Sequence, residues 1–128
     1  MRCETGLIMS TKQFGIKRIY KDPSQNDGYS VLIDRLWPRG VSKEEARLDE
    51  WLKEIAPSTK LRKWFNHEPG KFDEFTRRYK GELTNREKEV KHLFEVTAVN
   101  QQVTLLYAAK DEEHNHALVL KEFLEEQI

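Results

Sequence analysis

The stretch that decides the fold is an apolar run that ends in charged residues: Tyr29-Ser30-Val31-Leu32-Ile33-Asp34-Arg35-Leu36-Trp37-Pro38-Arg39-Gly40. Its centre, residues 31–33, is apolar without alternation, which is typical of a strand buried on both faces of a sheet. Such a strand needs helices above and below it. We therefore predict a strand over residues 29–36 of an α/β protein.

Two further strands are predicted on either side of this one. The apolar run over 103–109 follows a long helical connection, so we expect it to be parallel to 29–36. The run over 16–20 precedes 29–36 by a connection of only eight residues, which is shorter than a parallel crossover needs, so we expect an antiparallel neighbour there. Together these runs predict a small mixed, partly parallel sheet with helices packed on it.

Capping patterns and helical spacing predict the helices. Boxes of the form Ser/Thr-x-x-Glu predict helix starts at Ser42–Glu45 and at Thr84–Glu87. The first of these helices is expected to continue to Pro57, which would end it. Apolar side chains at helical spacing predict the remaining helices, which should begin at Ser58 or Thr59, near Phe72 and near His116.

Length and composition exclude several classes of protein. A chain of 128 residues can bury a core without disulfides or a structural metal. The 22 basic and 22 acidic residues balance, which disfavours nucleic-acid binding, and the single cysteine excludes an internal disulfide. No apolar run suits a membrane span or a signal peptide. We expect a cytoplasmic protein with a flexible extension over 1–15 and a single α/β domain over 16–128.

Charged and polar residues follow both long apolar runs. Asp34, Arg35 and Arg39 follow the first, and the second is followed by Lys110, Asp111, His114, Asn115 and His116. Because parallel strands end at the same edge of a sheet, where ligands bind in such folds, we expect the two groups to meet there. Guanidinium groups grip phosphate or carboxylate with two hydrogen bonds, so an anionic small molecule is the predicted ligand.

Each of these residues has a predicted role, although catalysis is left open. We expect Asp34 or Asp111 to orient a group or act as a base, and His116 to transfer a proton. His114 and His116 have no third ligand at a diagnostic spacing, so neither a metal nor another cofactor is predicted. The predicted ligand-binding residues are Arg35, Trp37, Arg39, Lys110 and Asn115.

Other interpretations of these residues remain open. Asp34 could form a structural ion pair with Arg35, Arg39 or Lys110, and Trp37 could pack in the core instead of stacking on a ligand. The stretch 60–80 holds seven basic and three acidic residues, which suits either a nucleic-acid face or a solvated helix surface. A protein-interaction module is a third hypothesis, and it predicts a broad exposed apolar patch.

A set of motifs occurs in combination: Asp34 to Gly40, Glu54-Ile55-Ala56-Pro57-Ser58, Leu61-Arg62-Lys63-Trp64-Phe65, Thr104 to Asp111, and Asn115-His116-Ala117. Together they resemble the YeaO-like branch of the domain-of-unknown-function 488 family, over about Ile16 to Leu124. The resemblance implies a small cytoplasmic α/β domain and no particular activity. The wider family tends to carry Cys-His-Arg where this chain has Asn115-His116-Ala117, so the resemblance implies no thiol chemistry here.

Overall fold

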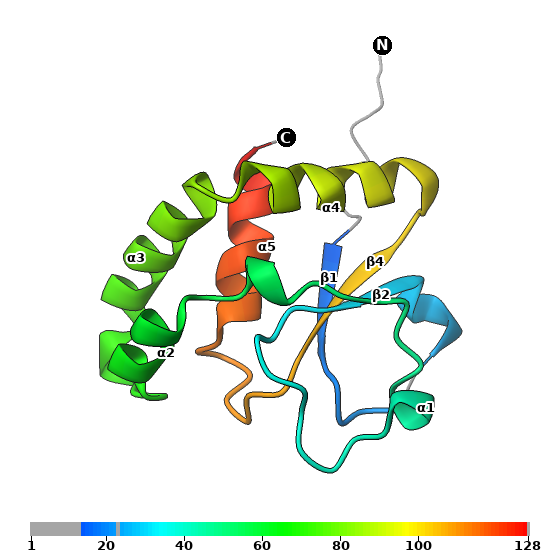
Figure 1. Cartoon of the computed structure of the whole chain (residues 1–128), viewed down its shortest axis with the longest axis horizontal. Helices are drawn as coiled ribbons and strands as arrows, with labels where there is room; N and C mark the ends of the chain where they lie inside the picture. The colour runs from blue at the N-terminus through cyan, green and yellow to red at the C-terminus, as the bar shows by residue number, and fades with distance from the viewer. Residues whose placement is uncertain (1–13, 23, 128) are drawn as a thin grey trace.

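The computed structural model describes residues 14–22 and 24–127, so most of the predicted extension over 1–15 lies outside the described residues. Within them lies a four-stranded sheet of order β1-β4-β2-β3, in which every pairing is parallel. Its strands are β1 (Phe14–Arg18), β2 (Tyr29–Leu32), β3 (Glu50–Trp51) and β4 (Val103–Tyr107). The prediction of a small α/β protein with helices packed on the sheet is confirmed (Figure 1).

The prediction that the first two strands are antiparallel neighbours was wrong. Ile16 of β1 and Val31 of β2 both lie opposite Leu105, because β4 separates the two strands. The ten residues 19–28 between them can reach about 33 Å, enough to return along a strand of about 17 Å without a helix. Gly28 makes this return possible: its φ is +64°, and a Cβ there would lie 2.1 Å from the Gln102 carbonyl oxygen.

The helix predicted from Ser42 to Pro57 is also wrong beyond its first turn. The capping box of Ser42 and Glu45 is present, but α1 (Lys43–Ala46) ends at Arg47, whose φ is +48°. The edge of β2 takes over the backbone that follows: the amides of Asp49 and Leu52 donate to carbonyls of β2. This segment therefore forms β3 and the 3₁₀ turn η3 (Lys53–Ile55).

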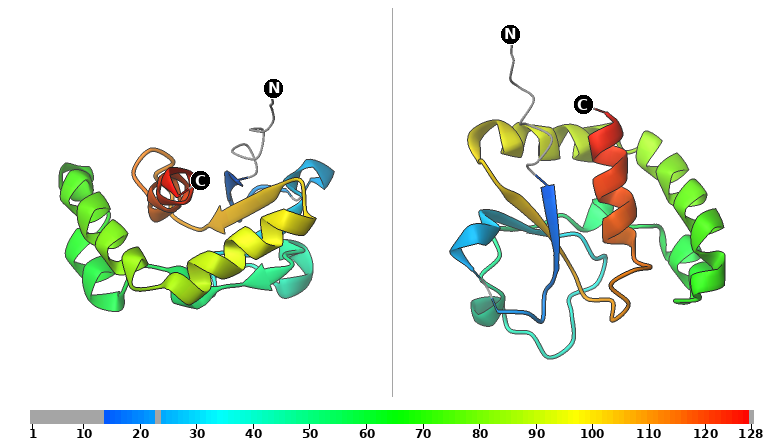
Figure 2. Two further views of the ribbon diagram at one scale, coloured as in Figure 1. Left: turned by 90° about the horizontal axis from the view of Figure 1, so that it is seen from above. Right: turned by 180° about the vertical axis from the view of Figure 1, so that it is seen from behind.

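The remaining helices lie close to their predicted positions. Ser58 caps α2 (Thr59–Phe65) and Asn115 caps α5 (His116–Glu126), each by accepting a backbone N–H. The second predicted capping box is absent, because the Thr84 hydroxyl donates to Lys80 O. Between α2 and α5 along the chain lie α3 (Phe72–Thr84) and α4 (Glu87–Val99), and α3 runs beside α5 (Figure 1). Seen from behind, α5 lies next to β1 (Figure 2).

Two apolar cores cover the two faces of the sheet. The larger core lies between the sheet and α2 to α5, and it includes the aromatic residues of 65–79. The smaller core packs Leu32 and Leu106 against Trp37 and Trp51. Tyr79 of α3 is completely buried in the larger core, where its hydroxyl donates to Ile55 O at 2.7 Å. Tyr79 thereby ties α3 to the end of η3.

Replacing Tyr79→Phe tests this bond. We expect the free energy of unfolding to fall by about 1–3 kcal/mol at pH 7, because the Ile55 carbonyl would lose its donor. Burial raises the pKa of Tyr79 well above its ordinary range. In the unfolded wild type the Tyr79 hydroxyl therefore ionises near pH 10, whereas in the folded protein it stays protonated. The difference in the free energy of unfolding between wild type and Tyr79→Phe should therefore shrink as the pH rises above 10. Urea denaturation at pH 7 and pH 11 measures the free energy of unfolding of both proteins. A difference between them that is the same at the two pH values would contradict the expected pH dependence.

Candidate functional site

A cavity of about 540 Å³ lies where the ends of β2 and β4 approach α2. Figure 1 shows the loop after β4, in orange, beside the loop after β2. Of the residues after β2 and after β4 that were expected to meet, all but Arg39 line this one cavity. Its lining residues are Asp34, Arg35, Leu36, Ala56, Pro57, Arg62, Phe65, His67, Phe75, Ala108, Ala109, Lys110, Asp111, His114, Asn115 and His116.

A carboxylate–imidazole pair joins the end of β2 to the start of α5. Asp34 Oδ1 lies 3.0 Å from His116 Nε2, and both side chains are more than four-fifths buried. The same nitrogen lies 3.1 Å from Ile33 O, so it faces two acceptors and we assign its proton to Nε2. The N–H points at the carbonyl. Asp34 Oδ1 therefore lies in close polar contact with the imidazole but accepts no directed hydrogen bond, while Asp34 Oδ2 accepts from Ala108 N at 3.1 Å.

Arg35 contacts backbone rather than a carboxylate. Its Nε donates to Pro57 O at 3.3 Å and its Nη2 to Ala56 O at 3.2 Å. Within the described residues its guanidinium forms no salt bridge, and the predicted ion pair of Asp34 with Arg35, Arg39 or Lys110 is not present. Asp34 pairs with His116 instead. Arg35 thus holds the segment 56–57 that forms one wall of the cavity.

Arg18 and Arg86 hold the walls in the same way. Arg18, the last residue of β1, donates to Ala109 O at 2.8 Å and Ala108 O at 3.2 Å. Arg86 donates to Ala56 O at 2.8 Å and also to Glu54 O. The carbonyls of Ala56, Ala108 and Ala109 lie beyond the ends of strands and helices, so they need donors from elsewhere. Sequence reasoning missed both arginines, since only the strand register brings Arg18 beside the end of β4.

The loop after β4 is held by its own polar side chains. Asp111 Oδ1 accepts from the amides of Glu113 and His114, and Oδ2 lies 2.9 Å from His114 Nδ1. Hydrogen bonds lower the pKa of Asp111, with the largest effect from the Glu113 N–H and a smaller one from His114. Asn115 uses both ends of its amide, accepting from Leu118 N and donating to Asp111 O. Asp111 and Asn115 therefore shape the cavity, and the catalytic role predicted for Asp111 and the ligand-binding role predicted for Asn115 remain predictions.

Three basic residues lie at the exposed rim of the cavity. Arg62 comes from α2, His67 from the turn after it and Lys110 from the loop after β4. None of the three forms a salt bridge within the part of the chain that the structure describes. Sequence reasoning placed Arg62 in a general basic stretch and His67 in a solvated turn. The turn was visible in the sequence, but only the packing of α2 against α3 directs it toward the cavity.

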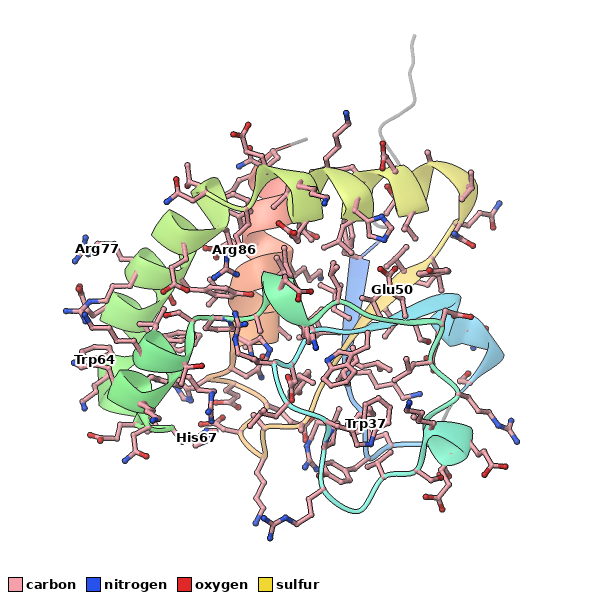
Figure 3. The ribbon with its side chains drawn as sticks, in the orientation of Figure 1. Trp37, Glu50, Trp64, His67, Arg77 and Arg86 are labelled. Atoms are coloured by element: carbon pink, nitrogen blue, oxygen red, sulfur yellow. The ribbon has the colours of Figure 1, made fainter. Side chains whose placement is uncertain are left out.

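Trp37 and Arg39, two of the predicted ligand-binding residues, do not line the cavity. The Trp37 indole packs edge to face on Trp51, with 5.4 Å between ring centroids, and its Nε1 donates to Val41 O at 2.6 Å. Arg39 is exposed in the loop, where its carbonyl accepts from the Tyr20 hydroxyl. Figure 3 shows His67 near the loop after β4 and Trp37 on the side toward α1.

The basic stretch 60–80 is largely paired with acidic side chains. Arg77 and Arg78 both bind Glu74, and their hydrogen bonds lower the pKa of this carboxyl to about 2. Lys71 pairs with Glu68, and Lys80 of α3 pairs with Glu122 and Glu126 of α5. Arg77 points outward, away from the cavity (Figure 3). Among the described basic residues of this stretch, salt bridges leave Lys60, Arg62 and Lys63 of α2 unpaired.

The chain matches one protein-family model over residues 13–128, described as "Inactive DUF488-N3 subclade". It belongs to the DUF488 family. It is 50% identical over 108 residues to the uncharacterised protein YeaO of Escherichia coli, covering 84% of this chain and 93% of that protein. The uncharacterised protein Rv3073c of Mycobacterium tuberculosis is 38% identical over 109 residues, covering 85% of this chain and 91% of that protein. No solved structure matches the chain. The resemblance to the YeaO-like branch is confirmed.

Two further observations concern the described ranges alone. None of their helices has the length and apolar character to cross a membrane. They also contain no cluster of three or more His, Cys, Asp or Glu side chains that could hold a metal ion.

The substitution Arg35→Met tests whether the hydrogen bonds of Arg35 to the cavity wall stabilise the fold. Loss of the donor to Pro57 O should lower the free energy of unfolding by about 1–3 kcal/mol. Arg39→Met is the matched control, because the exposed Arg39 contributes only its carbonyl to a hydrogen bond, and it should change stability by less than about 0.5 kcal/mol. Chemical denaturation measures both, and equal small losses would show that the Arg35 contacts do not stabilise the fold.

Proposed function

We propose that the cavity binds a small anionic molecule, carrying a phosphate or a carboxylate, and that the protein acts by binding rather than by turnover. The observation that carries the proposal is the placing of Arg62 and Lys110 at one cavity although they are far apart in the sequence. Both are exposed and without an acidic partner among the described residues. Unpaired cations that converge on a concave site attract and orient an anion.

The volume and the electrostatics of the cavity agree with a small, negatively charged ligand. A volume of about 540 Å³ falls within the range of pockets that hold small molecules. The start of α5 also borders the cavity through Asn115 and His116, and the dipole of a helix favours negative charge at its N-terminus. We place this function in the cytoplasm, to which the single cysteine is suited.

The state of the acid–base groups favours binding without catalysis. Asp34 Oδ2 accepts from Ala108 N, Asp34 Oδ1 accepts no hydrogen bond but is buried against His116, out of reach of a ligand, and the His116 Nε2 proton is directed at Ile33 O. Asp111 is occupied by its own loop. A general base needs a free acceptor within reach of the reacting proton. The description of the matched family model as inactive supports the same conclusion.

The two alternative functions find less support. A nucleic-acid face over 60–80 would need free basic side chains, but Lys71, Arg77, Arg78 and Lys80 pair with carboxylates. An interaction module would need a broad apolar patch. The large hydrophobic side chains exposed in the described part of the chain come from three separate segments: Tyr20, Leu36 and Val99.

Titration with inorganic phosphate at low ionic strength, followed by amide NMR shifts, tests the proposed function. We expect saturable shifts at Arg62, His67 and Lys110. Arg62→Ala and Lys110→Ala should each weaken binding about tenfold, equivalent to about 1.4 kcal/mol. Lys63→Ala is the matched control, because Lys63 is an exposed cation on α2 that does not line the cavity, and it should change binding less than twofold. Shifts that do not saturate, or equal losses in all three variants, would overturn the proposal.

A further inference from the structure

We infer that the anionic group of the ligand is carried on an apolar body, so that the site takes an aryl or alkyl phosphate or carboxylate and discriminates against sugar phosphates. This inference rests on the proposed function and narrows it to one chemical class. It follows from two properties of the cavity: the composition of its walls and the occupation of its polar groups.

The walls of the cavity are largely apolar. The rings of Phe65 and Phe75 stack with 4.4 Å between their centroids, and both side chains line the cavity. Leu36 also lines the cavity, and 63% of its surface is exposed. A ligand with an apolar body would cover this surface. The apolar lining residues are Leu36, Ala56, Pro57, Phe65, Phe75, Ala108 and Ala109.

The polar groups of the walls are already used within the protein. Arg35 binds two carbonyls, Asn115 uses both ends of its amide, and Asp111 accepts from its own loop. Asp34 and His116 face each other and the backbone. Each hydroxyl of a bound sugar needs a partner to replace the water that it loses, and few remain here. An apolar body makes no such demand.

Charge then sets the orientation of the ligand. The carboxylates Asp34 and Asp111 belong to the wall, whereas Arg62 and Lys110 lie exposed at the rim. A phosphate or carboxylate is repelled by the first pair and attracted by the second. The anionic group therefore sits at the rim, and the apolar body points inward, against Phe65 and Ala109.

Three probes that share one phosphate group test the ligand class: inorganic phosphate, phenyl phosphate and ribose 5-phosphate, titrated into the full chain by calorimetry or NMR. We expect phenyl phosphate to bind at least tenfold more tightly than inorganic phosphate, and ribose 5-phosphate to bind no more tightly than inorganic phosphate. Equal affinities for phenyl and inorganic phosphate, or tightest binding of ribose 5-phosphate, would overturn the ligand class and leave the anion site standing. Binding of none of the three would overturn the proposed function itself.

A pair of exposed variants locates the apolar contact without disturbing the core. Leu36→Ser should weaken phenyl phosphate about threefold and leave inorganic phosphate unchanged. Val99→Ser is the matched control, because Val99 is an apolar side chain 82% exposed at the end of α4 and outside the cavity lining, and it should change neither affinity. Leu36→Ser without effect on phenyl phosphate, or with equal effect on both probes, would place the apolar body elsewhere and contradict the orientation given above.

Discussion

The parallel pairing of β4 with a strand on each of its sides is the constraint on which the rest of the structure depends. Every residue of β4 is buried, and its backbone serves both β1 and β2. Because all three strands run in one direction, their carboxyl ends meet at one edge of the sheet. Arg18, Asp34 and the loop over 108–115 are thereby brought together, although Arg18 and Ala109 lie 91 residues apart in the sequence. The cavity forms at this edge.

The cavity is built from irregular backbone, and that backbone has to be hydrogen-bonded. Arg18, Arg35 and Arg86 donate to carbonyls that take no part in the sheet, those of Glu54, Ala56, Pro57, Ala108 and Ala109. A guanidinium group suits this task because its donors are fixed in a plane and it can serve two carbonyls at once. These charges therefore support the cavity walls, whereas Arg62 and Lys110 are exposed and form no salt bridge among the described residues.

The Asp34–His116 pair has a related structural role. It connects the end of β2 to the first turn of α5, and Asp34 also accepts the amide of Ala108 at the end of β4. One carboxylate thus contacts both the end of β4 and the start of α5, which lie far from Asp34 in the sequence. Charged groups at this depth require partners, and these partners come from the backbone and the imidazole rather than from an arginine.

The sequence by itself determined the α/β class, the parallel relation of β2 and β4, the capping box of α1, the approximate starts of α2 and α5, and the meeting of the polar residues after β2 and β4, with the exception of Arg39. These features follow from local patterns: apolar runs, capping residues and the length of a connection. Only the tertiary structure decided that β4 lies between β1 and β2, that residues 49–52 join the edge of β2 instead of continuing a helix, and that Trp37 and Arg39 lie away from the cavity. It also decided which arginines hold carbonyls and which remain free. The physical reason is that hydrogen-bond partners and burial depend on which segments become neighbours in space, and local sequence patterns carry no record of those neighbours.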